Sequence, residues 1–167
     1  EGHDTKHHIQ TFCGIQHFDY NNLYGYSYEQ LFQTMRVLKL TYPEAEQMFR
    51  RMVFNVMATN YDDHTKNFAF SLKKEGKWEL SPAYDICYSY NPNNIWVSQH
   101  TLSINGKHKD ITKADLMTIA SANNIKKGEK IIDEIKLVVS NWQQYAEEVK
   151  VAQNLRDSIT KTLIALK

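Results

Sequence analysis

The most constraining feature of this chain is a run of apolar residues at helical spacing in its first half. The run recurs every three or four positions, which is typical of a helix with one buried face, and it comprises Ala45, Met48, Phe49, Met52, Val53, Val56 and Met57. The preceding Thr41-Tyr42-Pro43-Glu44 fits a capping box, in which Thr41 and Glu44 satisfy free backbone donors. We therefore predict a long helix that ends near Asn60 and packs within the core.

Weaker patterns predict the elements around this helix. Four further helices are expected, on the segments 27–38, 112–115 onward, 131–145 and 155–166. Phe68–Leu72 and Trp78–Leu80 flank a turn and predict a small β-hairpin. Residues 86–111 are irregular, with a short hairpin expected at Asn105-Gly106. Residues 1–26 show no sustained period, so we expect a loop or a short strand there.

Length and composition fit one globular domain that spans residues 1–167. With 42% hydrophobic and 23% charged residues, the chain has the profile of a soluble protein with a real core. No run is long enough to span a bilayer, and the start of the chain lacks the apolar stretch of a signal peptide. The net charge of +1 gives no global attraction to nucleic acid or membrane. We expect a cytoplasmic protein with Cys13 and Cys87 as free thiols, and a fragment of something longer, since the chain lacks an initiator methionine.

Polar side chains able to do chemistry gather directly after the long helix. The segment Asn60-Tyr61-Asp62-Asp63-His64-Thr65-Lys66-Asn67 packs six acidic, basic or amide side chains into eight residues of a predicted loop. Past the predicted hairpin comes Ser81-Pro82-Ala83-Tyr84-Asp85-Ile86, in which Asp85 stands between aromatic and apolar neighbours. A charge in such surroundings is seldom left unpaired, so we expect Asp85 to have a partner or a metal ion.

Phosphoryl transfer suits this arrangement, because the reaction depends mainly on positioning and charge. One carboxylate must face the attacking hydroxyl, while a second carboxylate and an amide oxygen hold magnesium, which prefers hard oxygen ligands. Protein-kinase loops place the base Asp and the metal-binding Asn five positions apart, and Asp62 and Asn67 have this spacing. Lys66 lies between them, where a cation would meet the phosphoryl charge, and Asp85 would be the second metal ligand.

The residues around these positions resemble the HipA family of toxin kinases. The resemblance rests on Asp62-Asp63-His64-Thr65-Lys66-Asn67, on Leu80-Ser81-Pro82-Ala83-Tyr84-Asp85-Ile86 and on the spacing between the two motifs. It extends over the whole chain, from Gln10-Thr11-Phe12-Cys13-Gly14 to a helical tail. The implied fold is mainly α: the helical carboxy-terminal lobe of a HipA-type kinase, with a small β-hairpin that carries the metal-binding loop.

The resemblance also implies a role for each motif residue. Asp62 is the expected catalytic base, and Asn67 and Asp85 are the expected magnesium ligands. ATP would be bound by His64, Thr65, Lys66, Asn67, Tyr84 and Asp85. Asp63 stands where some members carry glycine, so no catalytic role follows for it.

Partners follow from the resemblance as well. One is a HipB-like DNA-binding antitoxin, and the chain would contact nucleic acid only indirectly, through this antitoxin. The other is a protein substrate; the known substrates of the family include aminoacyl-tRNA synthetases.

One departure from kinases concerns glycine. A kinase covers the phosphates with a glycine-rich loop and pairs them with a strand lysine. The six glycines of this chain are too widely spaced for such a loop: Gly2, Gly14, Gly25, Gly76, Gly106 and Gly128. We therefore expect the nucleotide-gripping lobe to be absent from these 167 residues and the fragment alone to be nearly inactive.

Alternatives stay open for the single residues and for the function. Asp62 and Asn67 also suit a solvated polar loop, Asp85 could pair with Lys66, His64 could be structural, and Tyr84 could lie in the core. Besides a serine/threonine protein kinase, the residues suit a small-molecule phosphotransferase, or a non-catalytic module that binds an antitoxin or its DNA complex. Four histidines near the start fit no standard zinc-finger spacing: His3, His7, His8 and His17.

Overall fold

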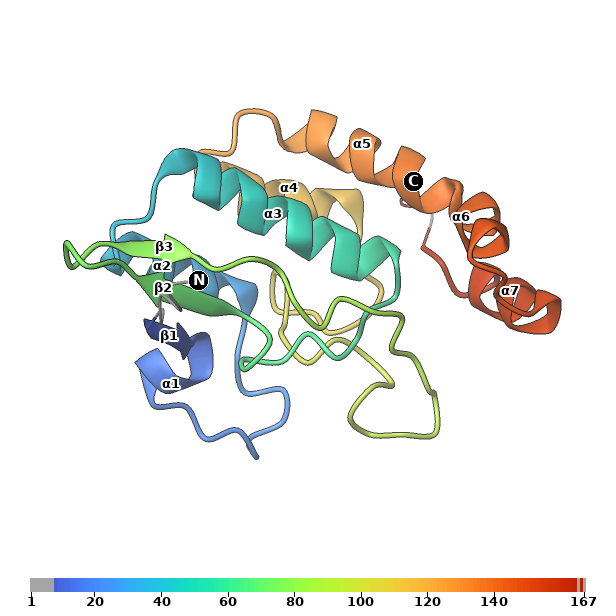
Figure 1. Ribbon diagram of the computed structural model, residues 1–167, viewed down its shortest axis with the longest axis horizontal. Helices are drawn as coiled ribbons and strands as arrows, with labels where there is room; N and C mark the ends of the chain where they lie inside the picture. The colour runs from blue at the N-terminus through green and yellow to red at the C-terminus, as the bar shows by residue number, and fades with distance from the viewer. Residues whose placement is uncertain (1–7, 165, 167) are drawn as a thin grey trace, which may run out of the picture.

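The computed structural model describes residues 8–164 and residue 166. Within them the chain forms seven helices and one three-stranded antiparallel sheet, so the mainly helical prediction is confirmed (Figure 1). The elements are, in chain order, β1 His8–Thr11, α1 Phe12–Gln16, α2 Tyr28–Val37, α3 Tyr42–Met57, β2 Ala69–Leu72, β3 Trp78–Leu80, α4 Lys113–Ala122, α5 Gly128–Ser140, α6 Trp142–Glu148 and α7 Gln153–Thr160. None of these helices is both long and apolar enough to cross a membrane.

Helix α3 lies at the centre of the molecule. The residues of its apolar run from Met48 to Met57 are fully buried, and Figure 1 shows α3 between the sheet on one side and α4 and α5 on the other. The predicted capping box is present at its start, where Glu44 Oε2 accepts a hydrogen bond from the Thr41 amide at 2.7 Å. Glu44 Oε1 also accepts one from the Leu80 amide at 2.7 Å, so the same side chain fastens β3 to α3.

The sheet has the strand order β1-β2-β3, with both pairs antiparallel. Strands β2 and β3 confirm the predicted hairpin. Strand β1 adds to it at the other edge of β2, with Thr11 opposite Ala69. Because the side chains of β1 are exposed or half-buried, the strand has no period-two pattern that would have predicted it.

The helices after α4 differ from their prediction. A single helix over 131–145 was expected, but α5 ends at Ser140 and α6 begins at Trp142. Apolar residues keep their register through the break, so spacing alone does not reveal it. The last helix was expected to reach residue 166, but α7 ends at Thr160, and Leu155, expected on its apolar face, is exposed.

The tail after α7 returns to the carboxyl end of α3. The Ile164 amide donates to the Met57 carbonyl at 3.0 Å, and Thr59 Oγ1 donates to the Thr162 carbonyl at 2.8 Å. Thr162 Oγ1 also lies 3.0 Å from the hydroxyl of Tyr88. The tail therefore contacts both the residues that follow α3 and the segment that follows Asp85.

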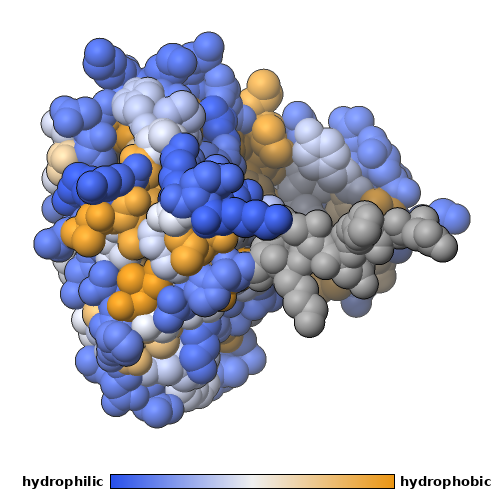
Figure 2. Space-filling model, turned by 60° about the vertical axis from the view of Figure 1, so that its left-hand side comes forward, coloured by the Kyte–Doolittle hydropathy of each residue, from blue (hydrophilic) through white to orange (hydrophobic). Residues whose placement is uncertain are grey.

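The face in Figure 2 is mostly hydrophilic, with apolar side chains in separate patches. Cys13 is buried and Cys87 is exposed, and both are free thiols as expected.

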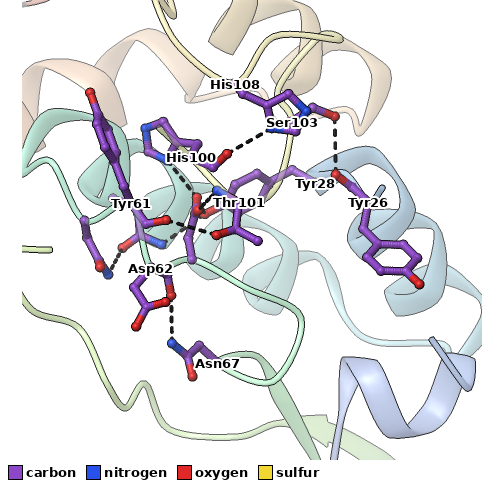
Figure 3. A network of polar contacts seen from close by, with 12 residues as sticks. Tyr26, Tyr28, Tyr61, Asp62, Asn67, His100, Thr101, Ser103 and His108 are labelled. Carbon is purple, nitrogen blue, oxygen red and sulfur yellow. Dashed lines mark hydrogen bonds and ion pairs between the residues drawn. The ribbon is translucent and has the colours of Figure 1, made fainter. Parts of the chain in front are cut away.

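A buried carboxylate, Asp63, fixes the loop between α3 and β2. Its side chain is 0% exposed. Asp63 Oδ2 accepts from the Tyr28 hydroxyl at 2.9 Å and lies 2.8 Å from His100 Nδ1, while Oδ1 accepts from the Thr101 amide at 2.8 Å. Figure 3 shows this network, in which the loop meets α2 and the irregular segment 86–111. Asp63 thus joins three segments that are distant in sequence.

A second carboxylate, Asp115, fastens the end of the irregular segment. The predicted turn at Asn105-Gly106 is present, with Ile104 and Lys107 paired across it. Asp115 accepts hydrogen bonds from Asn105 Nδ2 and Lys107 Nζ, each at 2.8 Å, and from Thr112 Oγ1 at 2.6 Å. Burial alone would raise the pKa of Asp115, but the hydrogen bonds from Lys107, Thr112 and Asn105 outweigh it and hold that pKa well below its usual range.

We expect Asp63→Ala to lower the free energy of unfolding by about 3–5 kcal/mol, because it leaves buried donors without their acceptor. Urea unfolding of this variant, compared with Asp62→Ala, measures the effect. The adjacent Asp62 side chain is 36% exposed, so its removal should cost less than about 1 kcal/mol. Equal losses in the two variants would contradict this account of the loop.

Asp115→Asn should destabilise the protein by about 1–3 kcal/mol at neutral pH, because the acceptor of four donors is weakened. Since the folded pKa is depressed, the contribution of Asp115 is present above the unfolded pKa, about 3.9, and is lost as the pH falls below it. The difference between wild type and variant in urea unfolding should therefore shrink between pH 6 and pH 3. The control is Asp133→Asn, since Asp133 is exposed; a pH-independent difference for Asp115→Asn would refute the assignment.

Candidate functional site

The candidate site is built on the extended loop that leaves α3 and enters β2. Side chains alternate between the two sides of an extended segment, and here Asp63 is buried while Asp62 is only half-buried. The buried residue anchors the loop, and its neighbour is thereby held toward the surface. The two adjacent aspartates of the motif consequently have different environments.

Asp62 has the environment of a partly desolvated base. Partial burial raises the pKa of its carboxyl, and the charges of Asp85 and Asp63 raise it further, whereas His64 lowers it. His64 Nε2 lies 3.7 Å from Asp62 Oδ1. A carboxylate with a raised pKa holds an incoming proton better, which is what general-base catalysis requires.

Asn67 and Asp85 come together at one small cavity, although 18 residues of chain separate them. Asn67 Nδ2 donates to the backbone carbonyl of Asp62 at 2.8 Å (Figure 3). This bond uses the amide nitrogen of Asn67 and leaves its oxygen free to bind a cation. Asp85 has a left-handed backbone with φ of 52°, a conformation that costs energy for a residue other than glycine and is common at functional sites.

Asp85 differs from one expectation. Its side chain is exposed rather than enclosed by its apolar neighbours, and among the described residues no ion pair joins it to Lys66. Sequence neighbours do not report burial in an irregular segment, because such a segment can turn any side chain outward. The carboxylate is therefore available to a ligand from solvent.

Lys66 and His64 lie together beside Tyr20. The Lys66 ammonium sits 3.6 Å from the centroid of the Tyr20 ring, a cation–π contact, and His64 packs edge-on against the same ring at 5.1 Å. His64 Nδ1 also accepts from the Lys66 amide at 3.3 Å. His64 thus makes structural contacts with Tyr20 and Lys66 and also lies beside the carboxylate of Asp62.

Tyr84 and Thr65 have different surroundings. Tyr84 is 41% exposed, so the core alternative for it is wrong; its hydroxyl donates to the carbonyl of Lys66 and joins the two motifs. Thr65 is buried, and its carbonyl accepts from the Cys13 amide at 3.0 Å. The side chain of Thr65 consequently lies on the inner side of the loop, away from the exposed carboxylates.

The oxygen atoms at the cavity fit magnesium. A free amide oxygen on Asn67 and an exposed carboxylate on Asp85 are the hard ligands that this ion prefers, and magnesium needs few of them because it keeps several waters. No group of three or more His, Cys, Asp or Glu that could hold a metal occurs in residues 8–164 and 166. His3 and His7, considered above for zinc, lie outside the described residues.

Three residues border the site without belonging to either motif. Tyr20 holds Lys66 and His64, and Arg51 and Asn60 line the cavity of Asn67 and Asp85. Asn60 opens the polar loop, but nothing in its spacing sets it apart. The signal that could have found this corner is Asn55, a polar residue that is 3% exposed on the buried face of α3.

Comparisons with known proteins agree with this architecture. The chain is similar to a chain in the complex of HipA, HipB and operator DNA of the toxin–antitoxin system of Shewanella oneidensis MR-1, with a TM-score of 0.71 and 19% identity. The match covers 93% of this chain and 41% of that chain. At this identity the likeness shows the fold alone, and the present chain spans less than half of the protein it matches. No curated protein matches the chain.

The family is established by a separate comparison. The family model described as the HipA-like C-terminal domain matches residues 2–142. This range includes both motifs, every residue of the candidate site and all elements from β1 to α5. The protein therefore belongs to the HipA-like C-terminal domain family.

Proposed function

We propose that this chain is the catalytic lobe of a serine/threonine protein kinase of a toxin–antitoxin system. The observation that carries the proposal is the arrangement of the two motifs, in which Asp62 and Asn67 of the loop after α3 meet Asp85 of the segment after β3. Asn67 and Asp85 line one cavity, Asn67 donates to the Asp62 carbonyl, and the charge of Asp85 raises the pKa of Asp62. If the loop were only a solvated polar loop held by local caps, the three side chains would have no reason to lie together.

Each residue has a definite task in the proposed reaction. Asp62 accepts the proton of the attacking hydroxyl, helped by its raised pKa. Asn67 and Asp85 hold magnesium, which when bound neutralises phosphate charge. Lys66 is exposed and meets the negative charge of the nucleotide, while Tyr20 supports its ammonium from behind. His64 and Tyr84 border the nucleotide and keep the loop in shape through their contacts with Asp62 and Lys66.

The rest of the proposal concerns what lies beyond this chain. It lacks a glycine-rich loop and spans 41% of the protein it matches, so we assign the nucleotide-gripping lobe to a further part of the full protein. The matched complex contains HipB and operator DNA, and by analogy we propose a HipB-like antitoxin as partner. A protein hydroxyl is the proposed acceptor.

Two other functions compete with this one. A small-molecule phosphotransferase would use the same acid, amide and acid set and would differ only in its acceptor. A non-catalytic module for antitoxin binding would not require Asp62, Asn67 and Asp85 to be retained together at an accessible corner. Assays with protein and small-molecule acceptors separate the first two, and the variants below separate both from the third.

Asp62→Asn should reduce phosphoryl transfer roughly 10²–10⁴-fold in the polypeptide that joins this chain to its nucleotide lobe, because it removes the proton acceptor. Transfer of radiolabelled phosphate from ATP to protein measures it. Unfolding in urea should be nearly unchanged, which separates this variant from Asp63→Ala. Asp133→Asn, at an exposed position on α5, is the control for a lost carboxylate. Near-native turnover of Asp62→Asn would show that another group is the base.

The 167 residues alone should bind magnesium–ATP weakly, with a dissociation constant on the order of millimolar or weaker, because half of the phosphate contacts are missing. Calorimetry with ATP and magnesium measures this affinity, and a parallel transfer assay should detect almost no product. Activity should return when the nucleotide lobe is present in the same chain. Micromolar binding and robust transfer by these residues alone would mean that the nucleotide site has been misplaced.

A further inference from the structure

One oxygen atom beside the proposed metal site lacks a hydrogen-bond partner. Asn60 is only 2% exposed, and its Oδ1 is buried with no partner among the described residues. Asn60 lines the same cavity as Asn67 and Asp85. An unpaired buried acceptor lowers the stability of a folded protein by about 1–3 kcal/mol. Its presence here therefore indicates that a ligand binds to this oxygen.

The direction in which Asn60 points is set by a chain of hydrogen bonds that begins at Asp63. A carboxylate can only accept, so the Tyr28 hydroxyl donates to Asp63 Oδ2, at 2.9 Å. The Tyr28 oxygen in turn accepts from Asn55 Nδ2 at 3.0 Å. Asn55 then has only its oxygen left for Asn60, and Asn60 Nδ2 donates to it at 3.0 Å.

The last amide in this chain is thereby oriented. With its nitrogen committed to Asn55, Asn60 must present its oxygen on the other side. The buried Asp63 carboxylate thus fixes the direction of hydrogen-bond donation in the three linked side chains of Tyr28, Asn55 and Asn60. The cavity receives an acceptor, which suits a cation or the hydrogen atoms of a water and does not suit an anion.

The cavity has room for a small occupant. Its volume is about 10 Å³, close to the space that one water molecule requires. Asn67 and Asp85 form its accessible side, and Asn55, Asn60 and Asp63 form its buried wall. A magnesium ion held by Asn67 and Asp85 would keep several waters, and one of these fits the space in front of Asn60.

We propose that Asn60 is a further residue of the magnesium site, whose Oδ1 accepts a hydrogen bond from a metal-bound water, with its orientation set by Asp63 through Tyr28 and Asn55. This inference rests on the proposed function, because it takes Asn67 and Asp85 as the metal ligands. Asn60 is a positioning residue here, since it acts on the metal through water.

Arg51 supplies the competing explanation. It also lines the cavity, its Nη2 donates to the Ser81 carbonyl at 2.8 Å, and its Nε has no partner among the described residues. A water that accepts from Arg51 Nε and donates to Asn60 Oδ1 would satisfy both atoms without any metal. Metal affinity decides between the two accounts.

The test is a titration of the 167-residue chain with Mn²⁺ as the probe for magnesium, followed by the electron paramagnetic resonance signal of the free ion. No nucleotide is needed, so the readout is independent of activity. Asn60→Ala should weaken Mn²⁺ binding roughly tenfold, as loss of a group that orients a metal's surroundings does. Asn123→Ala truncates an amide that makes two hydrogen bonds at the end of α4, away from the cavity, and should leave the affinity unchanged.

Tyr28→Phe tests the chain of hydrogen bonds. It removes the hydroxyl that links Asp63 to Asn55 but does not alter the cavity lining, so it should weaken Mn²⁺ binding severalfold. Urea unfolding of every variant shows that the protein remains folded. If Asn60→Ala does not fold, the comparison of Tyr28→Phe with wild type decides.

Failure of this inference is distinguishable from failure of the proposed function. If Asp85→Asn weakens Mn²⁺ binding while Asn60→Ala and Tyr28→Phe do not, the oxygen serves only the water at Arg51 and the inference is overturned. If Asp85→Asn has no effect, or wild type binds no Mn²⁺, the metal site itself is wrong and the proposed function falls with it.

Discussion

The buried carboxylate of Asp63 is the interaction on which the rest of this structure depends. It takes donors from α2 and from the segment 86–111 and thereby fixes a loop that has no regular hydrogen bonding of its own. The loop in turn sets the positions of Asp62 and Asn67. A carboxylate without exposure is costly unless it is fully hydrogen-bonded, so the segments that surround Asp63 must assemble together. The energetic anchor and the proposed chemical group are thus adjacent residues with opposite environments.

The sequence predicts the parts of this fold that carry a strong period. The apolar run of α3, its capping box and the hairpin of β2 and β3 are present as expected, because each depends on local spacing or on a short motif. A short strand was expected within residues 1–26 as one alternative to a loop, and it is present as β1, but its bounds could not be predicted because it is stabilised by pairing with β2. The break at Asn141 could not be predicted, since it leaves the apolar register intact. The exposure of Asp85 could not be predicted either, because burial in an irregular segment depends on distant residues.

The candidate site follows the same division. Asp62, Asn67 and Asp85 could be identified from their motifs, whereas their supports could not. Asn55 and Tyr28 contribute through hydrogen bonds between side chains that are 27 residues apart, and Tyr20 contributes through a ring placed under Lys66. Such contacts depend on tertiary structure and leave no spacing in the sequence. Motifs therefore identify the groups that meet the ligand, and the structure adds the residues that orient them.

The return of the tail to the end of α3 has a consequence for how the protein is made. Thr59 and Thr162 are bonded across 103 positions, so the loop leaves the ribosome long before the residues that complete its surroundings. At about 5–20 residues per second, that interval lasts several seconds. A nascent chain can form α3 and the sheet during this time, but the hydrogen bonds of Thr59 with Thr162 and of Met57 with Ile164 form only after the tail has been made. The carboxyl end of α3 therefore gains its contacts with the tail late in the synthesis of this lobe.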